Sequence, residues 1–170
     1  MRFSITTVLF AASLASAYTI ANRQTTLPAC AQTCYANTSP APCNATDVAC
    51  QCVNENFGAE LTKCVMSNCT QSDQLQAQQA VIETCKTAGV DISGGDPFPA
   101  CAQTCVQNTK SSTCADPNDD ACFCKDTAWV QAVDTCFKSS CTDPDLQTAK
   151  DVGEAECRAY GVDISPTVGA

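Results

Sequence analysis

The sequence contains no histidine, the side chain that proteins use most often as a general base and as a metal ligand near neutral pH. No serine or cysteine nucleophile is identifiable once the thiols are paired, and no carboxylate pair stands out for glycoside hydrolysis. The chain therefore offers no acid–base constellation on which a reaction could be built. We predict that the protein is not an enzyme.

Basic residues are also scarce, since nine lysines and arginines stand against eighteen acidic residues and the formal net charge is -9 at pH 7. Phosphate backbones and anionic bilayers attract clusters of Lys and Arg. The charge balance thus argues against nucleic acid as a partner and against binding to an anionic membrane surface. Mutual repulsion of acidic groups favours a protein that stays dissolved.

Long hydrophobic runs are missing except near the start, where an apolar stretch from Ile5 to Leu14 follows Arg2 and precedes the small residues 15–17. This order is typical of a secretory signal peptide, which we expect at residues 1–17. No stretch reaches the roughly 20 apolar residues of a transmembrane segment, so none is expected. Residues 165–170 show no spacer and hydrophobic tail that would direct a GPI anchor. The sequence predicts a freely secreted, extracellular protein.

Cysteine, in contrast, occupies 16 of 170 positions, a share that marks a disulfide scaffold in an exported chain. Metal-binding thiolates, the alternative, belong mainly to reducing compartments. The cysteines form two series of eight, with successive separations of 4, 9, 7, 2, 12, 5 and 16 positions in the first series and 4, 9, 8, 2, 12, 5 and 16 in the second. One extra residue between the third and fourth cysteines is the sole difference, which indicates an internal duplication.

Other residues repeat with the cysteines. Residues 28–34 recur as 99–105, and residues 89–93 recur as 161–165, with the turn-forming segment 94–99 between the copies. We therefore expect module 1 at residues 18–95 and module 2 at residues 96–170. Aromatic residues make up only 6% of the chain and each module is small, so cross-links must supply much of its stability.

The local patterns predict helices. Pro28 and Pro99 suit the first turn of a helix whose cysteines, spaced i,i+4, share one face. An apolar stripe predicts a second helix over residues 57–68 and over its counterpart in module 2. The last helix of each module has possible N-caps in Thr70 or Ser72 and in residues 142–144, and it ends at Gly89 or Gly161. Alternation typical of strands is absent, so the fold class expected is all-α and disulfide-rich.

Both copies resemble the CFEM family of fungal extracellular proteins, which have eight cysteines, a Pro-x-Cys-Ala opening and an Asp-x-x-Cys-x-Cys centre. The centre reads DVACQC from Asp47 and DDACFC from Asp119, followed at matching places by Phe57 and Trp129. The resemblance implies two tandem helical baskets with four nested disulfides each, whereas spacing alone leaves 105 pairings for eight cysteines. The implied pairs are Cys30–Cys69, Cys34–Cys64, Cys43–Cys50, Cys52–Cys85, Cys101–Cys141, Cys105–Cys136, Cys114–Cys122 and Cys124–Cys157.

The resemblance also implies a cofactor. Some CFEM proteins bind haem on a flat apolar platform, with the aspartate three residues before the fourth cysteine as axial iron ligand; here these are Asp47 and Asp119. A carboxylate is a hard oxygen donor that favours ferric iron, which suits haem uptake or relay in iron acquisition. Tyr35 could wall the platform of module 1, whereas its counterpart Val106 could not stack. The alternative for both aspartates is a turn or helix cap.

A different function remains open on the sequence alone. A secreted effector or cell-wall interaction protein, active in virulence or adhesion, would need the same cross-links and no haem. The expected partners are accordingly haem and other haem-relay proteins, or host and cell-wall components. Possible N-glycan acceptors at Asn37, Asn44 and Asn68 all fall in module 1, and a glycan at Asn44 would crowd the haem face there.

Overall fold

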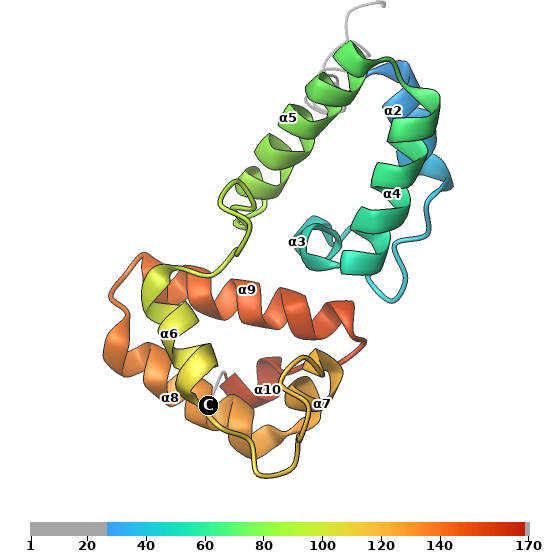
Figure 1. Cartoon of the computed structure of the whole chain (residues 1–170). Helices are drawn as coiled ribbons and strands as arrows, with labels where there is room; N and C mark the ends of the chain where they lie inside the picture. Colours follow the sequence, from blue (N-terminus) through green and yellow to red (C-terminus); the bar gives the residue numbers. More distant parts are fainter. Residues whose placement is uncertain (1–26, 169–170) are drawn as a thin grey trace, which may run out of the picture.

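The computed structural model describes residues 27–168, and every regular element in that range is an α-helix, which confirms the all-α prediction. The expected signal peptide, residues 1–17, lies outside the described residues. Module 1 contains α2 (Ala29–Asn37), α3 (Val48–Val53), α4 (Glu55–Asn68) and α5 (Gln71–Thr87). Module 2 contains α6 (Ala100–Asn108), α7 (Asp120–Lys125), α8 (Thr127–Ser140), α9 (Asp145–Ala159) and α10 (Ser165–Val168). Figure 1 shows the two modules as separate bodies joined by a short connection after α5.

The helix boundaries follow the expected signals with small differences. Pro28 and Pro99 are the residues immediately before α2 and α6, not members of their first turns. Thr70, and not Ser72, caps α5, because its hydroxyl accepts a hydrogen bond from the Asp73 N–H at 3.3 Å. Thr142 does not cap α9, which begins after Pro144 without a side-chain cap.

The last helix of each module ends where the sequence predicted. Gly89 and Gly161 adopt φ angles of 87° and 75°, and the following valine N–H bonds back to the carbonyl of the last cysteine in each module. Glycine enters this left-handed region without the steric penalty of a Cβ atom, so it lets the chain leave the helix abruptly.

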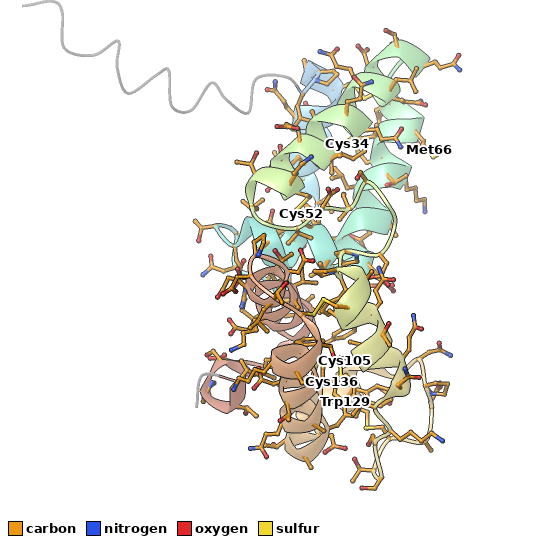
Figure 2. All side chains as sticks on the ribbon, turned by 90° about the vertical axis from the view of Figure 1, so that its left-hand side faces the viewer. Cys34, Cys52, Met66, Cys105, Trp129 and Cys136 are labelled. Atoms are coloured by element: carbon orange, nitrogen blue, oxygen red, sulfur yellow. A yellow bond between two sulfur atoms is a disulfide. The ribbon has the colours of Figure 1, made fainter. Side chains whose placement is uncertain are left out.

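Eight disulfides join the helices, and each set of four lies inside one module. The pairs are the eight that the resemblance implied: Cys30–Cys69, Cys34–Cys64, Cys43–Cys50, Cys52–Cys85, Cys101–Cys141, Cys105–Cys136, Cys114–Cys122 and Cys124–Cys157. Figure 2 shows Cys34 and Cys52 in module 1, and Cys105 and Cys136 beside Trp129 in module 2. The predicted division at residues 95 and 96 falls between the two sets.

Apolar clusters accompany the disulfides in module 2. Phe137 and Val133 of α8 pack with Ala102 of α6 and Ala149 of α9. A second cluster surrounds the Cys124–Cys157 disulfide and is completed by α10. None of the helices in residues 27–168 combines the length and the apolar character that crossing a bilayer requires.

The modules meet through α3 and α9. Figure 1 shows α9 along the side of module 2 that faces module 1, with α3 directly above it. Ala159 is buried against the Cys43–Cys50 disulfide, and Val53 packs on the same cluster. A Cβ placed on Gly161 would lie 3.8 Å from the Pro42 side chain, so the end of α9 is close to module 1 there. We call this surface the inter-module contact.

Candidate functional site

Asp47 and Asp119 occupy the same structural position, the N-cap of the short helix that carries the fourth and fifth cysteines of each module. Asp47 Oδ1 accepts a hydrogen bond from the Cys50 N–H at 3.1 Å, and Asp119 Oδ1 accepts one from the Cys122 N–H at 3.0 Å. Their backbone angles agree closely, with φ/ψ of -87°/80° and -89°/72°. The extra residue of module 2 is therefore absorbed by the preceding loop. The cap role, raised above as an alternative, uses one carboxylate oxygen of each residue and leaves the other.

The second oxygen of Asp119 is available. Within the part of the chain that the structure describes, Asp119 Oδ2 has no hydrogen-bond or ion-pair partner, and the side chain is exposed. Asp119 lines an open, shallow depression of about 650 Å³. Ala121 and Ala128 contribute apolar surface to this depression, and Lys125 contributes a positive charge.

Asp126 borders the same depression, but hydrogen bonds within the protein occupy both of its carboxylate oxygens. Its Oδ2 accepts hydrogen bonds from the hydroxyls of Ser111 and Thr113, both at 2.6 Å, and its Oδ1 caps α8 through the N–H groups of Ala128 and Trp129. These bonds, led by those from Ser111 and Thr113, lower the pKa of Asp126 to about 2. Asp126 thus fixes the loop that forms one wall, whereas Asp119 keeps one oxygen without a partner among residues 27–168.

Asp47 has a different neighbour. The Nε of Arg158, on α9 of module 2, donates to Asp47 Oδ2 at 2.7 Å, and its Nη1 lies 3.6 Å from Glu154 Oε2. Burial alone would raise the pKa of Asp47, but the hydrogen bonds from Arg158 and Cys50 and the guanidinium charge outweigh it, so the pKa lies below its ordinary value. Both oxygens of Asp47 are therefore engaged.

Tyr35, on α2, contacts α3 through Gln51 and makes no described contact with Asp47. Its hydroxyl donates a hydrogen bond to Gln51 Oε1, and its ring meets Phe57 edge-on with centroids 5.6 Å apart. The Gln51 Nε2 in turn donates to the carbonyls of Asn44 and Ala45, at 3.1 and 3.0 Å. Tyr35 thus supports the loop that leads to Asp47, through Gln51, a buried residue that sequence reasoning missed.

Module 2 replaces this polar arrangement with an apolar one. Val106, Phe123 and Trp129 stand where module 1 has Tyr35, Gln51 and Phe57, and the two aromatic rings of module 2 pack with centroids 4.8 Å apart. They line a partly enclosed cavity of about 80 Å³, which is small beside the roughly 300 Å³ of the smallest cofactor sites. The open face beside Asp119 is therefore the candidate.

Glu156 also borders the cavity of module 2. Its pKa is raised to about 8, first by burial and then by the negative charges of Asp120, Asp96 and Glu55. Glu156 therefore holds its proton at neutral pH. Its counterpart in module 1 is the neutral Thr84.

The donor groups near Asp119 suit a metal ion that is already coordinated mostly by the atoms of a cofactor. Among residues 27–168 no three acidic or cysteine side chains gather into a set that could hold a bare metal ion. The iron of a porphyrin needs only an axial protein ligand, and the hard carboxylate oxygen of Asp119 is a chemically suitable donor for the ferric state. The residues present therefore fit haem better than they fit a free cation.

Two disulfide-stapled, all-helical repeats with an aspartate cap before the fourth cysteine define the class of this protein. The CFEM domain model matches residues 23–86 and 95–158, so the chain belongs to the CFEM family. It is 38% identical over 96 residues to the GPI-anchored hemophore cfmB of Aspergillus fumigatus, and this match covers 55% of this chain and 45% of that protein. It is 32% identical over 91 residues to the secreted hemophore CSA2 of Candida albicans, covering 51% of this chain and 59% of that protein.

These matches are partial in length. The chain spans about half the length of the curated relatives it matches. No solved structure matches it.

Proposed function

We propose that this protein is an extracellular haem-binding protein rather than an enzyme, and that Asp119 of module 2 is its ferric-iron ligand. The observation that carries the proposal is the unpartnered Oδ2 of Asp119 beside an open depression, in a helix cap whose other oxygen is already used. Relatives named hemophores support haem as the ligand.

The surroundings of Asp119 suit haem chemically. Haem has an apolar macrocycle and two propionates. The depression offers the methyl groups of Ala121 and Ala128 and the ammonium of Lys125, beside the carboxylates of Asp119 and Asp126. Because a carboxylate favours ferric over ferrous iron, reduction would weaken binding and allow haem to pass to other relay proteins in iron acquisition.

Asp47 is proposed as the corresponding ligand of module 1, with Tyr35 supporting its loop. Its position in the module matches that of Asp119, but its Oδ2 is paired with Arg158. Module 1 therefore needs a rearrangement before its aspartate can reach iron.

Titration of the mature protein with ferric haem, followed by its absorption band, tests the proposal. Asp119→Ala should abolish or strongly weaken binding, because it removes the iron ligand. Asp116→Ala is the matched control, since Asp116 lies in the same loop and its carboxylate accepts hydrogen bonds from the backbone N–H and the side-chain amide of Asn118, at 2.9 and 3.4 Å. Equal binding by the Asp119→Ala protein would contradict the proposal, and absence of binding in every protein would favour an effector or cell-wall interaction function.

A further inference from the structure

Arg158 gives Asp47 different surroundings from those of Asp119. The residue at its place in module 1 is Lys86, which is exposed and forms no ion pair with the residues described here. The guanidinium, in contrast, reaches Asp47 across 111 positions of sequence and occupies the oxygen that is free in Asp119. The two modules repeat each other, but this contact has no counterpart.

We infer that Arg158 and the end of α9 close the iron-ligand position of module 1, so that the intact chain binds one haem, on module 2. A second ligand position opens only when α9 leaves α3. This inference rests on the proposed haem function and concerns how one of its two sites is regulated.

Two features of the inter-module contact support the closure. The ion pair engages the remaining oxygen of Asp47, whose side chain keeps only 26% of its surface exposed. Ala159, the next residue after Arg158, is buried against the Cys43–Cys50 disulfide at the start of α3. A ligand that reaches Asp47 must therefore displace both a charge and a packed helix end.

The closure is held by non-covalent contacts, without a disulfide between the two modules. Partly exposed ion pairs contribute little stability, and the contact buries a small apolar cluster rather than a large core. A partner protein or a change in solution that separates the modules would expose Asp47 without unfolding either set of disulfides, since every bridge lies inside one module.

The test counts haem molecules per chain in the full-length mature protein. We expect one equivalent for the wild type and for Asp47→Ala, and none for Asp119→Ala. The double variant Arg158→Ala/Ala159→Gln removes the charge and forces the packed residue off the disulfide, and it should bind two. Adding Asp47→Ala to this double variant should restore the binding of one haem per chain. The control variant Lys86→Ala/Thr87→Gln changes the equivalent positions of module 1 and should still bind one haem per chain.

A haem-independent measurement accompanies the titrations. The carboxyl of Asp47 is titrated by NMR in the wild type and in Arg158→Gln, and loss of the guanidinium should raise its pKa. Circular dichroism checks that each variant keeps its helices. An unchanged Asp47 titration contradicts the ion pair and overturns the inference.

The remaining outcomes separate this inference from the proposed function. Two equivalents in the wild type, one lost with each aspartate, would overturn the closure and leave haem binding intact. A folded Arg158→Ala/Ala159→Gln protein that still binds one equivalent would also overturn it. Absence of haem binding in every protein, with a normal shift of the Asp47 pKa, would overturn the proposed function and with it the closed site.

Discussion

Module 1 and module 2 share a cysteine framework but fill it differently. Module 2 buries Phe137 and Val133 against α6 and α9 and buries Val130 against α10, whereas the buried hydrophobic positions of module 1 are mostly alanines and cysteines. Helices that are stapled at four points keep their arrangement even when few large side chains lie between them. The disulfides therefore determine how the helices are arranged, and the side chains packed between the helices can differ from one module to the other.

The aspartates differ for another reason. Their local geometry is the same, but Asp119 faces solvent and Asp47 faces Arg158. A repeated residue therefore acquires its chemistry from the neighbours that the tertiary structure brings to it. Matched positions of the two modules allow both differences to be tested.

The largest expected effect concerns the core of module 2. Phe137→Ala should lower the free energy of unfolding by about 3–5 kcal/mol, because it leaves a cavity among residues that cannot fully collapse. Val65→Ala, at the equivalent and partly exposed position of module 1, should cost about 1 kcal/mol. Guanidinium unfolding followed by Trp129 fluorescence and circular dichroism measures both. Similar losses would show that the modules have equivalent cores.

The second prediction removes the same bridge from each module. Cys52–Cys85 and Cys124–Cys157 both close loops with a sequence separation of 33, so the chain-entropy model gives about 3–4 kcal/mol for each. Replacing Cys52 and Cys85 by alanine should unfold module 1, whereas replacing Cys124 and Cys157 should leave module 2 folded, because among the described residues module 2 has the larger apolar clusters. Hydrogen exchange in α5 and α9 reports each module separately. Protection that persists in α5 would contradict this difference.

The third prediction concerns pH. The folded chain keeps the proton of Glu156 up to about pH 8, whereas the unfolded chain releases it near the ordinary value of 4.5. The folded state therefore binds more protons in this window, and Glu156 makes stability fall as pH rises from about 4.5 to about 8. Glu156→Gln should flatten the profile and raise stability at pH 8 by a few kcal/mol.

The control for this pH profile is Thr84→Gln, at the matching position of module 1. Thr84 carries no charge and its hydroxyl bonds to the Ala80 carbonyl at 2.7 Å. The substitution should lower stability equally at every pH. Denaturant unfolding from pH 5 to 9 provides the measurement, and a wild-type profile in Glu156→Gln would contradict the role given to this carboxyl.

The smallest expected effect lies at the aspartates themselves. Asparagine can still cap a helix, so Asp47→Asn loses only the ion pair, which is worth up to about 1 kcal/mol, and Asp119→Asn should be nearly neutral. The lowered pKa of Asp47 means that its contribution is present above the ordinary value of 3.8 and is lost as pH falls through the folded pKa. Unfolding at low and high salt should show the difference between the two variants disappear with added salt.

Much of the fold could be predicted from short-range patterns. Cysteines at i,i+4, the Thr70 cap and the left-handed glycines at 89 and 161 each depend on neighbours within a few residues. The short helices α3, α7 and α10 were missed, because four to six residues are too few for a helical period to be recognised. Thr142 was a wrong cap candidate, since α9 starts only after Pro144.

The duplication, the all-helical class and the place of Asp47 and Asp119 before the fourth cysteine of each module all follow from the order of the residues. The ion pair between Arg158 and Asp47, and the lack of a partner for Asp119 Oδ2 among residues 27–168, are visible in the tertiary structure alone. Caps and cysteine spacings depend on local hydrogen bonds and chain geometry, which neighbouring residues specify. An ion pair between residues 111 positions apart depends on α9 packing on α3, and no local pattern encodes that contact.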